Sequence, residues 1–132
     1  MNNENENRNS RNRIELEGNV ANISDIQFNK NGKKTLRFDL GQNNNGSTQF
    51  VPIILRGNIV DSYNQDIKKG NWIFARGRVS TYQRDVTRDN HVFKDKVIEI
   101  IVFEIEDRTN NKLYTADGNV QELTSKNNDM ER

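Results

Sequence analysis

Two stretches of alternating apolar residues, separated by a polar turn, constrain the fold of this chain most strongly. The apolar side chains fall at even-numbered positions, at Ile14, Leu16, Val20, Leu36, Phe38 and Leu40. Such alternation is typical of strands that bury one face against a core. Gly18 interrupts the first stretch, and a glycine there suits the bulge or sharp bend that curls a sheet toward closure. We therefore expect a small, strongly bent sheet that closes into a barrel.

The chain of 132 residues is long enough for one domain, and its apolar residues are concentrated between Ile14 and Ile105. We expect a disordered, asparagine-rich arm over 1–12, a folded domain over 13–107 and a flexible polar tail over 108–132. The chain has no cysteine, which excludes disulfides and thiolate metal sites. No run approaches the ~20 apolar residues of a membrane span, and residues 1–12 do not resemble a secretory signal. We therefore expect a cytoplasmic protein without membrane contact.

Within the domain, the pattern predicts five strands and one helix. The strands are expected over 14–23, 36–40 with some upstream extension, 49–56, 72–81 and 97–105. A helix capped by Asn58 should end at Gly70, with an apolar face formed by Ile59, Val60, Tyr63 and Ile67. Three strands, a helix and two strands is the order of an OB-fold, an all-β five-stranded barrel with one helix. Its usual oligonucleotide site is the face of the second and third strands, bordered by the loops after the first and fourth strands.

Three connecting or irregular segments accompany this pattern. Residues 41–48 form a soft polar loop, and residues 83–96 form a long charged hairpin. Pro52 cannot donate a ladder hydrogen bond, so the strand over 49–56 should be unpaired on one side or bulged there.

Basic residues cluster in the two loops that border the expected groove. They are Lys30, Lys33, Lys34 and Arg37 in the first cluster, and Arg84, Arg88, Lys94 and Lys96 in the second. These side chains could neutralise phosphates, although solvated loops are often charged and three aspartates dilute the second cluster. The net charge of +1 does not by itself indicate a nucleic-acid binder.

The strand over 49–56 offers the sharpest candidate for base contact. Alternation places Val51, Ile53 and Leu55 in the core, and Phe50, Pro52, Ile54 and Arg56 outside. An outward ring and guanidinium can stack on bases of any sequence, with about 1–3 kcal/mol per base. The alternative is that Phe50 packs beneath a loop or a partner subunit. Tyr82 and Phe93 are weaker stacking candidates.

Other conspicuous side chains have simpler interpretations. Arg76 and Arg78 should pair with Glu15 and Glu17 across neighbouring strands. Trp72 and Phe74 suit a subunit interface better than a base platform. His91 should be a solvated loop histidine. The sequence has no nucleophile motif, phosphate-binding loop or cluster of metal ligands, so we expect neither an enzyme nor a cofactor or metal.

Six segments in order and spacing resemble the bacterial single-stranded DNA-binding protein (SSB) family. They are RIELEGNV, DIQFNKNG, FDL, FVPIILRGNI, IKKG and WIFARGRVSTY, within about Arg13 to Glu106. The resemblance implies an OB-fold that binds single-stranded DNA without sequence preference, as a homo-oligomer, with a tetramer favoured over a dimer. By position, Phe50 matches a stacking aromatic of the family, whereas Arg56 stands where many members have a second one.

The chain also departs from that family. It ends KNNDMER and so lacks the acidic tip with an apolar pair, which makes recruitment of replication proteins by that route unlikely to be part of its function. Glu15 and Glu17 put charge where members are often apolar, which puts the usual oligomer geometry in question. A divergent member, as from a phage, plasmid or other mobile element, fits these losses.

The expected function is therefore non-enzymatic binding and protection of single-stranded DNA in replication, recombination or repair. The basic residues Lys33, Lys34, Arg37 and Arg84 would contact phosphates while Phe50, Arg56 and Tyr82 contact bases. Two alternatives stay open: a primosome-type accessory protein that acts mainly through protein contacts, and an OB module that binds only protein. An OB-type nuclease is disfavoured because the carboxylates are dispersed.

Overall fold

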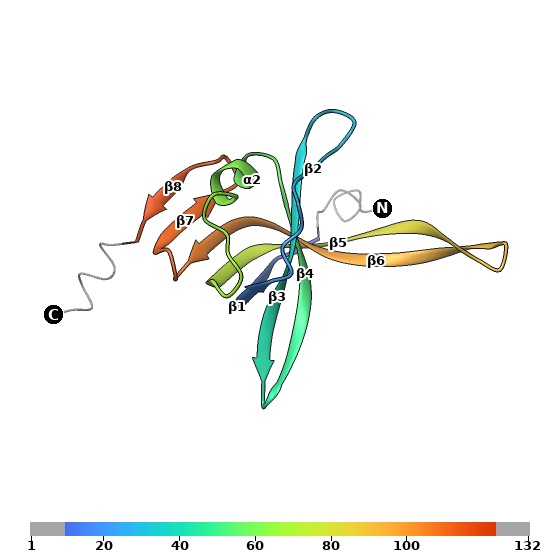
Figure 1. Ribbon diagram of the computed structural model, residues 1–132, viewed down its shortest axis with the longest axis horizontal. Coiled ribbons are helices and arrows are strands. Elements are labelled where there is room, and N and C mark those ends of the chain that lie inside the picture. Colours follow the sequence, from blue (N-terminus) through green and yellow to red (C-terminus); the bar gives the residue numbers. More distant parts are fainter. Residues whose placement is uncertain (1–9, 124–132) are drawn as a thin grey trace, which may run out of the picture.

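The computed structural model describes residues 10–123, which form a closed five-stranded barrel with one short helix (Figure 1). The barrel strands are β1 (Ile14–Ala21), β3 (Lys34–Asn44), β4 (Ser47–Arg56), β5 (Trp72–Arg88) and β6 (His91–Asp107). They pair in the closed cycle β1–β3–β4–β6–β5–β1, within which only the β4–β6 contact is parallel. The helix α2 (Asn58–Tyr63) lies between β4 and β5 in the sequence, which confirms the predicted OB-fold order.

The core is formed by the alternating apolar side chains of the barrel strands. Of the positions predicted to be buried, four are at most 2% exposed: Val20, Leu36, Phe38 and Leu40. Ile14 and Leu16 are partly buried and pack against the core. Gly18 lies next to the point where β1 begins to pair with β3 while still paired with β5. A Cβ on Gly18 would lie 2.2 Å from the carbonyl oxygen of Gly41, so only glycine allows β1 and β3 to approach this closely.

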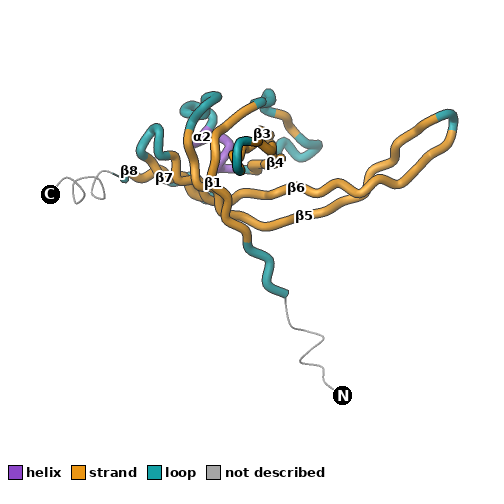
Figure 2. Tube along the Cα trace, turned by 90° about the horizontal axis from the view of Figure 1, so that it is seen from below, coloured by secondary structure: helices purple, strands orange, loops and turns teal. Residues whose placement is uncertain are grey.

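Two hairpins, β3–β4 and β5–β6, extend the barrel strands as arms (Figure 1), and the β5–β6 arm is also seen from the side in Figure 2. β3 and β4 pair continuously up to a two-residue turn at Asn45 and Gly46, whose φ angles are 53° and 90°. The expectation of a soft loop over 41–48 was therefore wrong, because the Asn-Gly pair supplies the positive φ angles of a tight hairpin turn. β5 and β6 likewise pair up to Asp89 and Asn90, so the charged hairpin over 83–96 is an unbroken continuation of both strands.

The helix is shorter than predicted. It begins after Gly57, whose φ is 78°, and not at an Asn58 cap, and it ends at Tyr63 instead of near Gly70. After Tyr63 the chain turns irregularly, because the carbonyl of Asp66 accepts hydrogen bonds from the side chains of Asn71 and Asn110 (3.0 and 3.1 Å). The predicted apolar face is confirmed, since Ile59, Val60 and Tyr63 are buried and Ile67 packs against the core.

Residues 108–123 differ most from the sequence-based expectation, which placed them in a flexible tail. They form β7 (Lys112–Thr115) and β8 (Val120–Glu122), which continue the sheet beyond β6. Tyr114 is fully buried; its ring stacks at a tilt on Tyr63, with 4.6 Å between centroids, and its hydroxyl donates to Asp66. The folded unit therefore extends beyond 107, while residues 124–132 of the expected tail lie outside the described residues.

Asn12, near the start of the described residues, is bound to β5. Residues 1–9 of the expected arm lie outside the described residues. The Asn12 side chain bonds both the N–H and the C=O of Val79, at 2.9 and 2.8 Å. A short strand, β2 (Gln27–Phe28), pairs with the start of β3 within the segment expected to be a turn.

The centre of β4 follows the predicted alternation with one exception. β4 pairs with β6 only through Ile53 and Ile54, so Pro52 lies outside that contact and is unpaired on one side, as predicted. The exception concerns exposure: Ile54 shares the outward side with Arg37, as predicted, but only 1% of its surface is exposed. Its register neighbours on the two sides are Arg37 in β3 and Ile101 in β6, and neighbours on the same face of adjacent strands cover it.

Candidate nucleic-acid interface

One continuous sheet surface carries most of the candidate contact residues. We call it the outer face: the side of β3, β4, β6 and β5 turned away from the barrel core. Residues paired across strands share a face, and alternate residues along a strand share it too. By these rules the outer face includes Arg37, Phe50, Arg56, Tyr82, Arg84, Arg88, Phe93 and Glu99.

Phe50 is placed as an exposed aromatic platform. Its register partner is Gly41, and a Cβ on that glycine would lie 3.4 Å from the Phe50 ring. The ring therefore covers bare backbone, while 55% of the residue stays exposed. An aromatic ring over a glycine in the neighbouring strand is held in place without a bulky neighbour, which leaves it accessible for stacking.

Two arginines lie beside a buried carboxylate on the same face. Arg37 Nε donates to Glu99 Oε2 at 3.2 Å and its Nη1 donates to Gln27 at 3.2 Å. Arg56 Nη2 lies 4.0 Å from Glu99 Oε1, which is an ion pair without a hydrogen bond. Both arginine side chains remain part-exposed, so each can still contact a ligand on the outer face.

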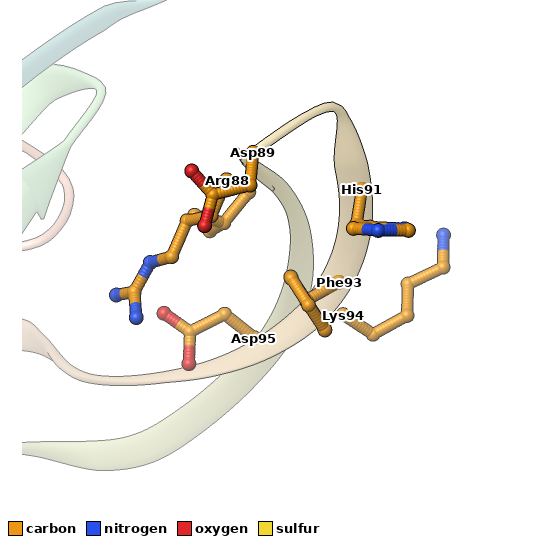
Figure 3. A pocket seen from close by; sticks show the side chains of 7 residues that line it. Arg88, Asp89, His91, Phe93, Lys94 and Asp95 are labelled. Carbon is orange, nitrogen blue, oxygen red and sulfur yellow. The ribbon is translucent and has the colours of Figure 1, made fainter.

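The β5–β6 arm separates the second basic cluster into two faces. Tyr82, Arg84, Arg88 and Phe93 share the outer face, whereas Lys94 and Lys96 share the opposite face with Val92 and Ile98. Near the tip, a hollow of about 360 Å³ is lined by Arg88, His91 and Phe93 and also by Lys94, whereas Arg84 and Lys96 do not line it (Figure 3). The structure therefore does not bring all four predicted cations of this hairpin to one surface.

Several of these cations already have acidic partners. Arg84 donates to Asp95 at 3.4 Å, and Lys94 donates to Asp85 at 2.7 Å. Lys34 pairs with Asp61 of the helix. Exposed ion pairs of this kind stabilise a protein by at most about 1 kcal/mol, so a phosphate could displace the acidic partner.

The turn between β2 and β3 presents the other predicted lysines. The side-chain oxygen of Asn29 accepts hydrogen bonds from the backbone N–H groups of Asn31 and Lys33, at 2.9 and 2.8 Å. Lys30 and Lys33 are exposed, and neither has an ion pair within the part of the chain that the structure describes. They are the free cations of the first cluster.

The side of the barrel formed by β1 and the start of β5 carries charge pairs of its own. Arg76 binds Glu15 (3.1 Å) and Glu104 (2.8 Å), which confirms the first expected cross-strand pair. Glu17 instead accepts a hydrogen bond from the Trp72 indole at 2.8 Å. Arg78 was expected to be paired, but it is exposed and has no ion pair in residues 10–123; it alternates with Tyr82 along β5 and so lies on the outer face.

The same side holds the other exposed aromatics of the sequence prediction. Trp72 is exposed, while Phe74 is half-buried beneath the Arg108 guanidinium, 4.7 Å from its ring centroid. Their assignment to a subunit interface stays a prediction.

Residues 10–123 show no metal site and no membrane-spanning helix. There the structure contains no group of three or more side chains arranged to hold a metal ion. Within the same residues, no helix is long and apolar enough to cross a membrane. His91 is exposed on the arm, 6.4 Å from the Phe93 ring centroid.

Glu99 is the residue of the outer face that sequence reasoning missed. A signal was present: an acidic residue interrupts the otherwise apolar run VIEIIVF of the last barrel strand. A charged side chain in such a run indicates either that the strand lies at the edge of the sheet or that the charge is buried beside a cation. The sequence did not show which cations would lie beside Glu99.

Comparisons with known proteins agree with this fold. The model of the single-strand binding protein family matches residues 11–107. Among solved structures, the Plasmodium falciparum SSB in complex with single-stranded DNA is similar, with 27% sequence identity and a TM-score of 0.58. That match covers 72% of this chain and 89% of the Plasmodium chain. No curated protein sequence matches the chain.

Proposed function

The chain belongs to the single-strand binding protein family, and we propose that it binds and protects single-stranded DNA along the outer face, without sequence preference. The observation that carries this proposal is the exposed Phe50 ring over Gly41, on a face shared with the part-exposed guanidinium groups of Arg37 and Arg56. Planar groups in a row on an open sheet surface suit stacking of unpaired bases. The solved complex of a similar SSB with single-stranded DNA supports the choice of ligand.

In this proposal the strand runs between the two basic hairpins. Lys30 and Lys33 contact phosphates at one rim, and Arg84 and Arg88 contact them along the arm. Four such contacts would give a slope of about −2.8 in a plot of log affinity against log salt, at about 0.7 per phosphate. Tyr82 and Phe93 offer further rings on the same face of the arm. Lys94 and Lys96, on the opposite face, contribute less.

The biological setting belongs to the same proposal. Single strands that need protection arise in replication, recombination and repair, in the cytoplasm and also during transfer of a mobile element. We favour a homo-oligomer, with a tetramer ahead of a dimer, because one barrel offers only a short track of stacking groups. Mass measurement by light scattering with and without DNA tests this point.

A fluorescence titration with poly-dT, followed by competition with duplex DNA and RNA, tests the binding itself. We expect saturable binding at low salt that weakens as salt rises, and duplex DNA should compete poorly. Absence of binding to poly-dT at low salt would refute the proposal.

A second candidate function has one observation in its favour. Arg37, Lys34, Arg84 and Lys94 are all ion-paired, which reduces the charge available for phosphates. A primosome-type dimer that binds DNA weakly and acts through protein contacts would suit such a surface, as would a purely protein-binding OB module. A dimer in light scattering together with weak, strongly salt-sensitive DNA binding would favour the accessory protein.

A further inference from the structure

Glu99 is a buried carboxylate in the middle of the proposed binding face. Only 6% of the residue is exposed, and its Oε1 atom has no hydrogen-bond partner among residues 10–123. Burying a charged group with an unsatisfied oxygen is costly unless nearby cations compensate. The compensation comes from Arg37, bonded to Oε2 at 3.2 Å, and Arg56, 4.0 Å from Oε1.

The two arginines differ in how firmly they are held. Arg37 is fixed at two positions, because its Nη1 also donates to Gln27. Within the described part of the chain, the Arg56 side chain has the ion pair with Glu99 and no hydrogen bond. Their side chains are 43% and 45% exposed, so both present part of the guanidinium to solvent while Glu99 lies beneath them.

We propose that Glu99 is a positioning residue that holds Arg37 and Arg56 against the sheet as stacking surfaces for bases and withholds their charge from phosphates. This inference rests on the proposed binding of single-stranded DNA. Guanidinium groups are planar and weakly hydrated, so they stack on rings even when their charge is neutralised nearby. Where members of the family often have a second aromatic, this chain thus presents a guanidinium with a built-in counter-ion.

Salt dependence separates stacking from phosphate contact. A cation that stays paired with a buried protein carboxylate when DNA binds releases few counterions, so it adds little to the salt slope, unlike a cation whose exposed partner a phosphate displaces. An unpaired arginine that binds a phosphate adds about 0.7 to the slope. The proposal therefore predicts that Arg37 and Arg56 contribute to affinity but not to the salt dependence in the native protein.

The test is Glu99→Gln, which keeps the side-chain shape and removes the charge, measured by poly-dT titration from 50 to 200 mM salt. We expect tighter binding at 50 mM and a slope steeper by about 0.7–1.4, for one or two released arginines. Across that salt range, the advantage of the variant over the native protein should fall by about threefold to sevenfold.

The matched control is Glu104→Gln. Glu104 also accepts a hydrogen bond from an arginine, but that arginine is Arg76 (2.8 Å), which pairs with β1 and lies at the start of β5. It changes the net charge equally, so an equal change of slope in this control would overturn the inference. An unchanged slope and affinity in folded Glu99→Gln would overturn it as well.

A second variant keeps the inference testable if Glu99→Gln does not fold. Arg56→Gln in the presence of Glu99 should weaken binding without altering the salt slope; a slope shallower by about 0.7 would overturn the inference. If the native protein itself fails to bind poly-dT at low salt, the proposed function fails, which is a distinct outcome.

Discussion

Replacement of Phe50 by alanine is the most direct test of the stacking platform. Just under half of this residue is covered, since 55% is exposed, and the covered part lies over Gly41. Stacking contributes about 1–3 kcal/mol per base. One face of the Phe50 ring lies against the backbone of Gly41, so only one base can stack on the other face. We therefore expect Phe50→Ala to lose about 1–2 kcal/mol of binding free energy. That loss is about a 5- to 30-fold weaker affinity for poly-dT at fixed salt.

The folded state should tolerate this change. Full burial of a phenylalanine side chain stabilises a protein by roughly 1.5–3 kcal/mol, so a ring covered by about half contributes about 1 kcal/mol. The variant should therefore fold and should melt only a few degrees below the native protein. Fluorescence titration at several salt concentrations, with thermal melting by circular dichroism, provides both measurements.

A matched control separates stacking from a general loss of apolar surface. Phe28 is also an exposed phenylalanine on the sheet, but its register partner Lys34 places it on the face opposite to Phe50. We expect Phe28→Ala to bind poly-dT as the native protein does. The reasoning would be refuted if Phe50→Ala bound within about twofold of the native protein, or if Phe28→Ala lost as much. A changed salt slope would show that the ring acts through phosphate contacts instead.

Three further predictions concern the arm, the barrel closure and the C-terminal hairpin. Arg88→Gln should weaken DNA binding and make the salt slope shallower by about 0.7. Lys96→Gln, on the other face of the arm, should change neither the affinity nor the slope. Equal effects of the two variants in the titration would contradict the assignment of these residues to opposite faces. Gly18→Ala should destabilise the barrel by about 2 kcal/mol or more in urea unfolding, because its Cβ would lie 2.2 Å from a backbone oxygen. A loss under about 0.5 kcal/mol would show that β1 and β3 can move apart at little cost in free energy. Tyr114→Phe removes the hydroxyl that donates to Asp66 and should lower the unfolding free energy by about 1–2 kcal/mol. Burial raises the pKa of the Tyr114 phenol, so the unfolded chain releases this proton at lower pH than the native protein does. Native stability should therefore fall as pH rises above about 10, and it should fall less in Tyr114→Phe. Equal dependence of melting temperature on alkaline pH in the two proteins would contradict this prediction.

Much of the barrel could be predicted from the sequence because strand alternation is a local property. The even-numbered apolar positions from Ile14 to Leu40 set which face of each strand is buried, whatever the strands pair with. The order of strands and the short helix then left few topologies. The outward position of Phe50 followed from the same period of two.

The errors came where tertiary contacts override local pattern. Polar composition suggested a soft loop over 41–48 and a tail over 108–132, yet hairpin pairing orders the first and the buried Tyr114 anchors part of the second. A single tyrosine in a polar segment has no periodicity, so nothing local indicates that it is buried. Ile54 points outward as predicted, but it is buried there, because period two does not show what covers the second face of a strand.

The sequence by itself therefore determined the strands, their buried faces, the position of the helix and the exposed Phe50, since these depend on neighbours along the chain. Only the tertiary structure decided which charges meet. Glu99 lies 62 residues from Arg37 in the sequence, and barrel closure through β4 and β6 brings them to one face. It also decided that Arg88 and Lys96 point to opposite sides of the arm, because that depends on the register of β5 against β6. Charge pairing acts through space over a few ångströms, and composition carries no information on that distance.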